Sequence, residues 1–184
     1  MTVYRLDTLP EEANKFVFDT NVLIYLHGFT GTYKTHDYKK KMRDYSLIAN
    51  NIISEQSNVY IDLVALSEFV NVYINEALAY KLNVNPKDFK FRKKDHRNLP
   101  EYQDVIDDLK SVINQIMTNY NIHIVKDGYD DFDVNSLTKI LPLMEFNDHL
   151  ITLVAKKYDS FLVTNDKDII NNCSDINVVT AVPA

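Results

Sequence analysis

The stretch Phe16-Val-Phe-Asp-Thr-Asn-Val-Leu-Ile24 decides the fold class. Together with Lys15, its first half is short, apolar and rich in β-formers, which predicts a buried strand over residues 15–19 that ends at the carboxylate of Asp19. Thr20 and Asn21 offer capping side chains, so we expect residues 22–26 to form a short helix. The stretch therefore indicates a strand that leads directly into a helix.

The same alternation of strand and helix continues along the chain. Further strands are predicted at residues 58–62, 122–125, 160–164 and 177–180, and helices at 36–56, 63–82, 101–120 and 147–158. No repeat, low-complexity tract or linker divides the sequence. This alternation predicts an α/β fold with a mainly parallel sheet, in one domain that spans residues 1–184.

Composition excludes several kinds of functional site. The 184 residues include three glycines and one cysteine, which excludes glycine-rich phosphate loops and zinc sites built on thiolates. The sequence shows no apolar run typical of a signal peptide or a membrane span. Since Cys173 can form no intrachain disulfide, a reducing compartment fits, and we expect a cytoplasmic protein without membrane contact.

Four carboxylates stand in otherwise apolar sequence. Asp19 and Asp166 follow two predicted strands, at the sheet edge where parallel sheets bind ligands. Glu68 lies on a predicted helix, and Asp148 begins another. Each acid alone has a structural alternative: a cap or turn for the two strand-end aspartates, the rim of a core for Glu68 and the helix dipole for Asp148.

Together, these acids and their neighbours resemble the PIN-domain nuclease family. The resemblance is carried by residues 16–24, residues 61–69, and residues 147–151 with 161–168. It implies a three-layer α/β/α fold and a ribonuclease that cuts single-stranded RNA with Mg²⁺ or Mn²⁺. It also implies, for many members, the toxin half of a toxin–antitoxin pair, so an antitoxin protein is an expected partner. The implied catalytic and metal-binding residues are Asp19, Glu68, Asp148 and Asp166, with Asn21, Thr164 and Asp168 in supporting roles.

The residue types agree with this chemistry. Phosphodiester hydrolysis needs a nucleophile stronger than neutral water and a shield for the phosphate charge, and an oxygen-ligated Mg²⁺ or Mn²⁺ ion supplies both. We find no His, Cys, Ser or Tyr placed with a base as a covalent nucleophile. The sequence therefore predicts catalysis by metal.

Two other functions remain open from sequence. A haloacid-dehalogenase-like phosphatase also begins with a strand that ends in Asp, but it needs a second Asp where this chain has Asn21. A PIN-like module could instead bind RNA or protein without cutting. Clustered carboxylates argue against that second function, because like charges repel and a silent domain gains nothing from them.

Two further features concern binding. The stretch from Lys87 to Arg97 contains six basic and two acidic residues, although the whole chain has a net charge of −6. We expect this stretch to hold the RNA backbone, against the alternative of a solvated loop. The substrate-binding residues expected there are Lys90, Arg92, Lys93 and Lys94. The predicted helix 36–56 has an aromatic face with Tyr38 and Tyr45, which could serve a homodimer or an antitoxin or could simply cover the core.

Overall fold

The central feature of the molecule is a parallel sheet. A computed structural model describes residues 2–31, 35–86, 96–130 and 132–181. These residues form a six-stranded sheet in the order β1-β6-β5-β2-β3-β4, and every strand pair in it is parallel. The strands are β1 (Thr2–Tyr4), β2 (Lys15–Phe18), β3 (Asn58–Asp62), β4 (Asn121–Val125), β5 (Phe161–Val163) and β6 (Asn177–Val179).

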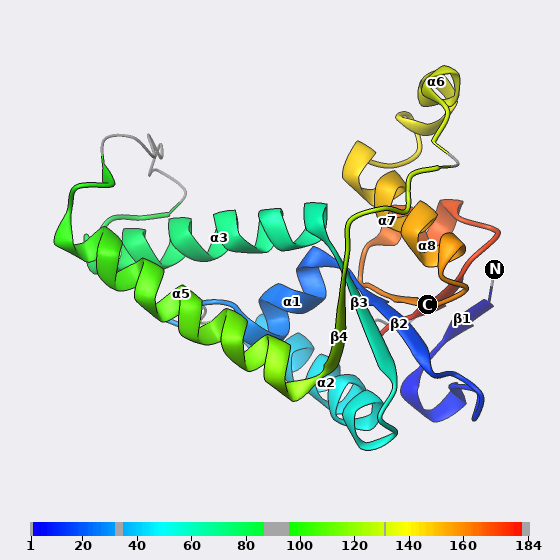
Figure 1. Cartoon of the computed structure of the whole chain (residues 1–184), viewed down its shortest axis with the longest axis horizontal. Coiled ribbons are helices and arrows are strands. Elements are labelled where there is room, and N and C mark those ends of the chain that lie inside the picture. The colour runs from blue at the N-terminus through cyan, green and yellow to red at the C-terminus, as the bar shows by residue number, and fades with distance from the viewer. Residues whose placement is uncertain (1, 32–34, 87–95, 131, 182–184) are drawn as a thin grey trace.

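Helices connect the strands and cover both faces of the sheet (Figure 1). The longer ones are α1 (Thr20–His27), α2 (His36–Ser54), α3 (Leu63–Lys81), α5 (Pro100–Asn119) and α7 (Phe146–Lys157). The shorter ones are α6 (Leu137–Ile140), α8 (Lys167–Asn172) and the 3₁₀ turns η1 (Leu6–Thr8) and η2 (Val134–Ser136).

Alternate residues of the strands build two separate cores. Phe16 and Phe18 of β2 are buried with α1, α2, α3 and α5, whereas Val17 between them is buried with α7 and α8. Successive side chains of a strand point to opposite faces, so a strand covered on both sides must be apolar throughout. This is why the central strand has no polar residue after Lys15. The predicted three-layer α/β/α fold with a mainly parallel sheet is confirmed.

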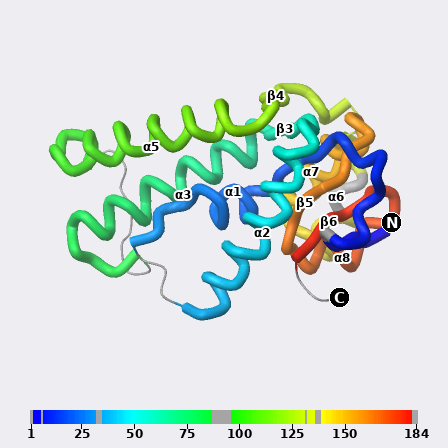
Figure 2. The backbone as a smooth tube through the Cα atoms, turned by 90° about the horizontal axis from the view of Figure 1, so that it is seen from below, coloured from blue at the N-terminus to red at the C-terminus, as the bar shows by residue number. Residues whose placement is uncertain are grey.

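Helices α3 and α5 extend well beyond the sheet. They run side by side, away from the strands, in both overall views (Figures 1 and 2). Lys81 at the end of α3 pairs with Asp104 and Asp108 of α5 at 3.3 and 3.7 Å. The two helices therefore form an arm whose far end lies away from the strand ends.

The predicted elements are found within one to two residues of their expected bounds, except at the N-terminus. There, β1 pairs with β6 at the edge of the sheet and was not expected from the sequence. No helix in the described part of the chain is long and apolar enough to cross a membrane.

Candidate active site

The order in which the chain adds strands to the sheet reverses between β2 and β5. From β2 the chain moves to β3 and β4 on one side, and it later returns to β5 and β6 on the other side of β2. Asp19 directly follows β2, Asp166 lies three residues beyond β5, and the backbone N–H of Asp19 donates to the carbonyl of Val163 at 3.1 Å. Such a switch point is where open parallel sheets bind ligands. Both strand-end acids therefore lie at the expected place for a site.

Asp19 is a buried carboxylate, with 5% of its surface exposed. It occupies the N-cap position of α1, but its side chain makes no capping hydrogen bond in the described structure. Instead, the hydroxyl of Thr164 donates to Oδ2 at 2.6 Å. Burial raises the pKa of Asp19 to about 6; the Asp166 charge adds to the rise, while the hydrogen bonds to the carboxylate oppose it. The backbone of Asp19 therefore occupies the cap position, but its carboxylate does not cap the helix.

Glu68 of α3 joins three helices. Thr20 of α1 donates its hydroxyl to Oε2 at 2.7 Å. The side-chain amide of Asn147, on α7, donates to Oε1. Both carboxylate oxygens are thus held in place, and the side chain is half-buried. These bonds fix the orientation of Glu68 relative to α1 and α7.

Asp148 lies in the first turn of α7 and is also half-buried. Its pKa is raised to about 7, first by burial and then by the negative charges of Asp166, Asp19 and Glu145, in that order. A first-turn aspartate that only served the helix dipole would have no such excess of negative neighbours. Its surroundings therefore favour the proton-bound or cation-bound form.

Asp166 caps the short helix α8. Its Oδ1 accepts the backbone N–H groups of Asp168 at 2.7 Å and Ile169 at 3.3 Å. Its own N–H donates to the hydroxyl of Thr164 at 2.9 Å. Asp166 therefore does act as a helix cap, as its structural alternative predicted, but it uses only Oδ1 to do so. Asp168, two residues further on, is exposed.

One cleft of about 490 Å³ gathers these side chains. The four candidate acids line it, together with the supporting residues Asn21 and Asp168. The other polar residues that line it are Thr20, Asn71, Glu145 and Asn147. A larger hollow, of about 550 Å³, lies where β2, β5 and β6 begin, at the opposite edge of the sheet from Asp19. We take the acid-lined cleft as the site, because parallel sheets bind ligands at the carboxyl ends of their strands.

The donor set of the cleft matches a hard divalent cation in type. Carboxylate and amide oxygens are the ligands that Mg²⁺ and Mn²⁺ prefer. Burial, and then the charges of neighbouring acids, raise the pKa values of Asp19 and Asp148, and a bound cation would offset both effects. Within the described residues, however, no group of three or more His, Cys, Asp or Glu side chains is arranged so that it could hold a metal ion. The types of side chain in the cleft thus suit a divalent cation, and the role of each acid as a metal ligand stays a prediction.

Other sequence predictions have different outcomes. Thr164 holds Asp19, as expected of a supporting residue. Lys90, Arg92, Lys93 and Lys94 lie outside the described residues. The predicted aromatic face of helix 36–56 is not free for a partner: Tyr45 is fully buried, and Tyr38 donates its hydroxyl to the carbonyl of Ile24. That face covers the core because α2 must bury its apolar side against α1.

Sequence reasoning missed the residues that hold Glu68. Thr20 and Asn147 lie 48 and 79 positions from it along the chain. Asp62, which follows Ile61 at the end of β3, was also missed; it caps α3 through Val64 and accepts a hydrogen bond from Tyr129. The positions of these residues in the sequence could have indicated them. Thr20 and Asn147 are each next to a candidate acid, and Asp62 is an aspartate at the end of a strand, much as Asp19 directly follows one.

Comparison with known proteins adds one structural likeness. No protein-family model matches this chain, and no curated protein matches it in sequence. Among solved structures, a chain in the crystal structure of VapBC2 from Rickettsia felis, bound to a DNA fragment from their promoter, is similar to it, with a TM-score of 0.47 and 15% sequence identity. The match covers 90% of this chain and 98% of that chain. The candidate site therefore rests on the residues and geometry of this chain.

Proposed function

We propose that residues 1–184 act as a single PIN-like nuclease domain that hydrolyses phosphodiester bonds of single-stranded RNA with Mg²⁺ or Mn²⁺. One observation carries the proposal: four acids from separate elements line one cleft at the switch point of a parallel sheet. The order of the three matching sequence blocks supports the same function.

In this proposal the acids of the cleft hold the cation, and neighbouring polar groups hold the acids. The ligands are Asp19, Glu68, Asp148 and Asp166. A bound Mg²⁺ or Mn²⁺ ion supplies a bound water of lowered pKa and a counter-charge for the phosphate. Thr164 orients Asp19, and Thr20 and Asn147 orient Glu68, through the hydrogen bonds described above.

Protons compete with the cation for this cleft. The pKa values of Asp19 and Asp148 are raised to about 6 and about 7. Both groups must lose their protons before they can bind a cation. We therefore expect metal affinity and cleavage to rise as the pH increases from about 6 to about 8.

The test is a cleavage assay on a mixture of single-stranded RNAs. We expect cleavage with Mg²⁺ or Mn²⁺, none with excess EDTA, and a loss of several orders of magnitude in Asp148→Asn. Asp107→Asn is the matched control, because it makes the same change on the exposed face of α5. Asp107→Asn should cut as the wild type does.

The alternative is a module that binds RNA or protein without cutting. RNA binding with no metal-dependent cleavage by the wild type would favour this alternative. The family resemblance supports an antitoxin protein or a second copy of this chain as a partner, and such a partner would have to bind outside the buried face of α2. The single cysteine fits a cytoplasmic role.

A further inference from the structure

A lysine without an acidic partner among the described residues is connected to the wall of the acid-lined cleft by hydrogen bonds. Lys41 of α2 is half-buried, and among the described residues its ammonium forms no ion pair. It donates instead to the hydroxyl of Tyr25 at 3.4 Å and lies 5.6 Å from the centre of that ring. A neutral hydroxyl leaves its positive charge uncompensated.

Tyr25 connects this lysine to the cleft wall. Its hydroxyl accepts a hydrogen bond from the side-chain amide of Asn165 at 3.2 Å. Asn165 directly precedes Asp166, and Ile24 directly precedes Tyr25; both Asp166 and Ile24 line the cleft. The Lys41 ammonium is therefore two hydrogen bonds away from a residue that adjoins the candidate site.

Stacked aromatic rings hold Tyr25 in place. Its ring lies parallel to that of Tyr45, with centroids 5.5 Å apart, and packs against Tyr38 at 5.2 Å. Tyr45 in turn donates its hydroxyl to the carbonyl of Thr164 at 2.9 Å. The position of the lysine is thus linked to the strand end that carries the acids, and α1 and α2 lie side by side here (Figure 2).

We propose that Lys41, supported by Tyr25 and Asn165, binds a backbone phosphate of single-stranded RNA on the α2 side of the cleft. This rests on the proposed function for the substrate class. A cleft lined by carboxylates repels a polyanion, so the RNA must be held by cations beside it, and a fixed ammonium without a carboxylate partner is suited to that task. Lys39, Lys40 and Arg43 of the same helix are exposed, and no hydrogen bond in the described part of the chain connects them to Tyr25 or Asn165.

The experiment measures RNA binding separately from cleavage. Fluorescence anisotropy with a labelled single-stranded oligouridine would be recorded over a range of salt concentrations in the Asp19→Asn background, where cleavage is suppressed. We expect Lys41→Gln to weaken binding by roughly tenfold, as for the loss of one charge-assisted hydrogen bond. The slope of log K against log salt should become shallower by about 0.7, the share of one phosphate contact.

Two further variants separate charge from structure. Arg43→Gln removes the same charge from α2 about 200° around the helix, two residues from Lys41 at ~100° per residue, and should leave the salt slope nearly unchanged. Lys41→Arg keeps the charge and should keep the slope.

Equal slopes for Lys41→Gln and Arg43→Gln, or an unchanged slope with only a lower Tm in Lys41→Gln, would overturn the phosphate contact while leaving the nuclease proposal intact. Conversely, if the salt slopes are as expected but the wild type shows no cleavage of RNA, the phosphate contact would be supported and the proposed nuclease activity would be contradicted. No RNA binding by the parent protein would overturn both.

Discussion

Thr164 connects the two strand-end acids through a single hydroxyl. It donates to Asp19 and accepts the backbone N–H of Asp166, and the side chain is fully buried. A buried donor or acceptor that loses its partner costs about 1–3 kcal/mol. At the scale of single residues, this hydroxyl is the part of the site whose removal should have the clearest effect on stability.

Thr164→Val should therefore lower the free energy of unfolding by about 1–3 kcal/mol, because it keeps the shape and removes both hydrogen bonds. The loss should also raise the pKa of Asp19 further, since the Thr164 hydrogen bond lowers it in the wild type. Urea denaturation measures the first effect. Thr164→Ser, which keeps the hydroxyl, should recover most of the loss; an equal loss in both variants would point to packing rather than to the hydroxyl.

The pKa of Asp19 gives a second residue-scale prediction, on stability without metal. Its folded-state pKa, about 6, lies above the ordinary aspartate value of 3.8, so the folded state binds the proton more tightly and loses stability as the pH rises from about 4 to about 6. For so buried a group the loss is on the order of 3 kcal/mol at neutral pH. Asp19→Asn removes this titration, so the free-energy difference between variant and wild type should grow across that pH window. Asp107→Asn should show no such growth.

Residues of this site differ in how well sequence reveals them. Asp19 and Asp166 were predictable because each follows a short apolar strand, and Thr164 because it precedes Asp166 by two residues. The contacts of Thr20 and Asn147 with Glu68 were not, since a polar residue next to a helix start has an equally good local explanation as a cap. Only tertiary packing decides between these explanations.

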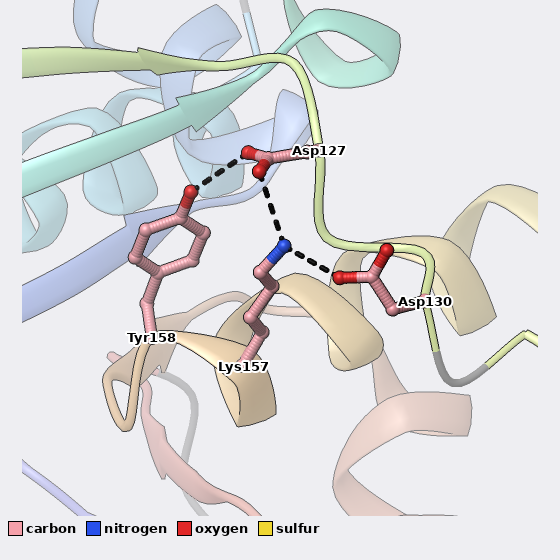
Figure 3. Close-up of polar contacts among 4 residues, drawn as sticks. All are labelled: Asp127, Asp130, Lys157 and Tyr158. Carbon is pink, nitrogen blue, oxygen red and sulfur yellow. Dashed lines mark hydrogen bonds and ion pairs between the residues drawn. The ribbon is translucent and has the colours of Figure 1, made fainter.

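At the scale of elements, α7 positions Asp148, and its C-terminal end is tied to the acidic turn after β4. Lys157 lies between Asp127 and Asp130 (Figure 3). Its ammonium is 3.1 Å from Asp127 and 2.7 Å from Asp130, and Tyr158 donates its hydroxyl to Asp127 at 2.9 Å. These contacts lower the pKa of Asp127 and raise that of Lys157. Such exposed pairs contribute little individually and are screened by salt.

Lys157→Ala should therefore cause a small fall in Tm at low ionic strength, and this fall should shrink at high salt. The effect should also fade at acidic pH, because a carboxylate with a lowered pKa contributes stability that is lost as the pH falls. Differential scanning calorimetry at two salt concentrations checks it. A fall in Tm that is independent of salt would show that the aliphatic stem of Lys157, rather than its charge, holds the turn.

The sequence failed to predict a strand that forms because it pairs with another strand, rather than because of its own apolar pattern. Thr2–Tyr4 becomes a strand because it pairs with β6 at the sheet edge, and three residues are too few for a period of two to be recognised. By contrast, α2, α3 and α5 each have 19 or 20 residues and a clear apolar face, so their positions were predictable.

At the scale of the whole molecule, the strand order concentrates negative charge at one point of the sheet. The cleft at the switch point holds acids that burial and mutual repulsion leave with raised pKa values. A cation that binds only the folded state stabilises it by mass action, by about 2.7 kcal/mol at a hundredfold excess over its Kd. The stability of the whole fold therefore reports on the site.

The most direct test is the Tm of the metal-free protein at about pH 8, with and without saturating Mn²⁺, in the wild type and in Asp19→Asn. We predict a rise of about 5–10 °C in the wild type, as expected for a chain of this size. In Asp19→Asn we predict a higher starting Tm and a much smaller rise, because one ligand and one repulsive charge are lost. The same Mn²⁺-induced rise in both proteins, or no rise in either, would contradict a metal site at this cleft.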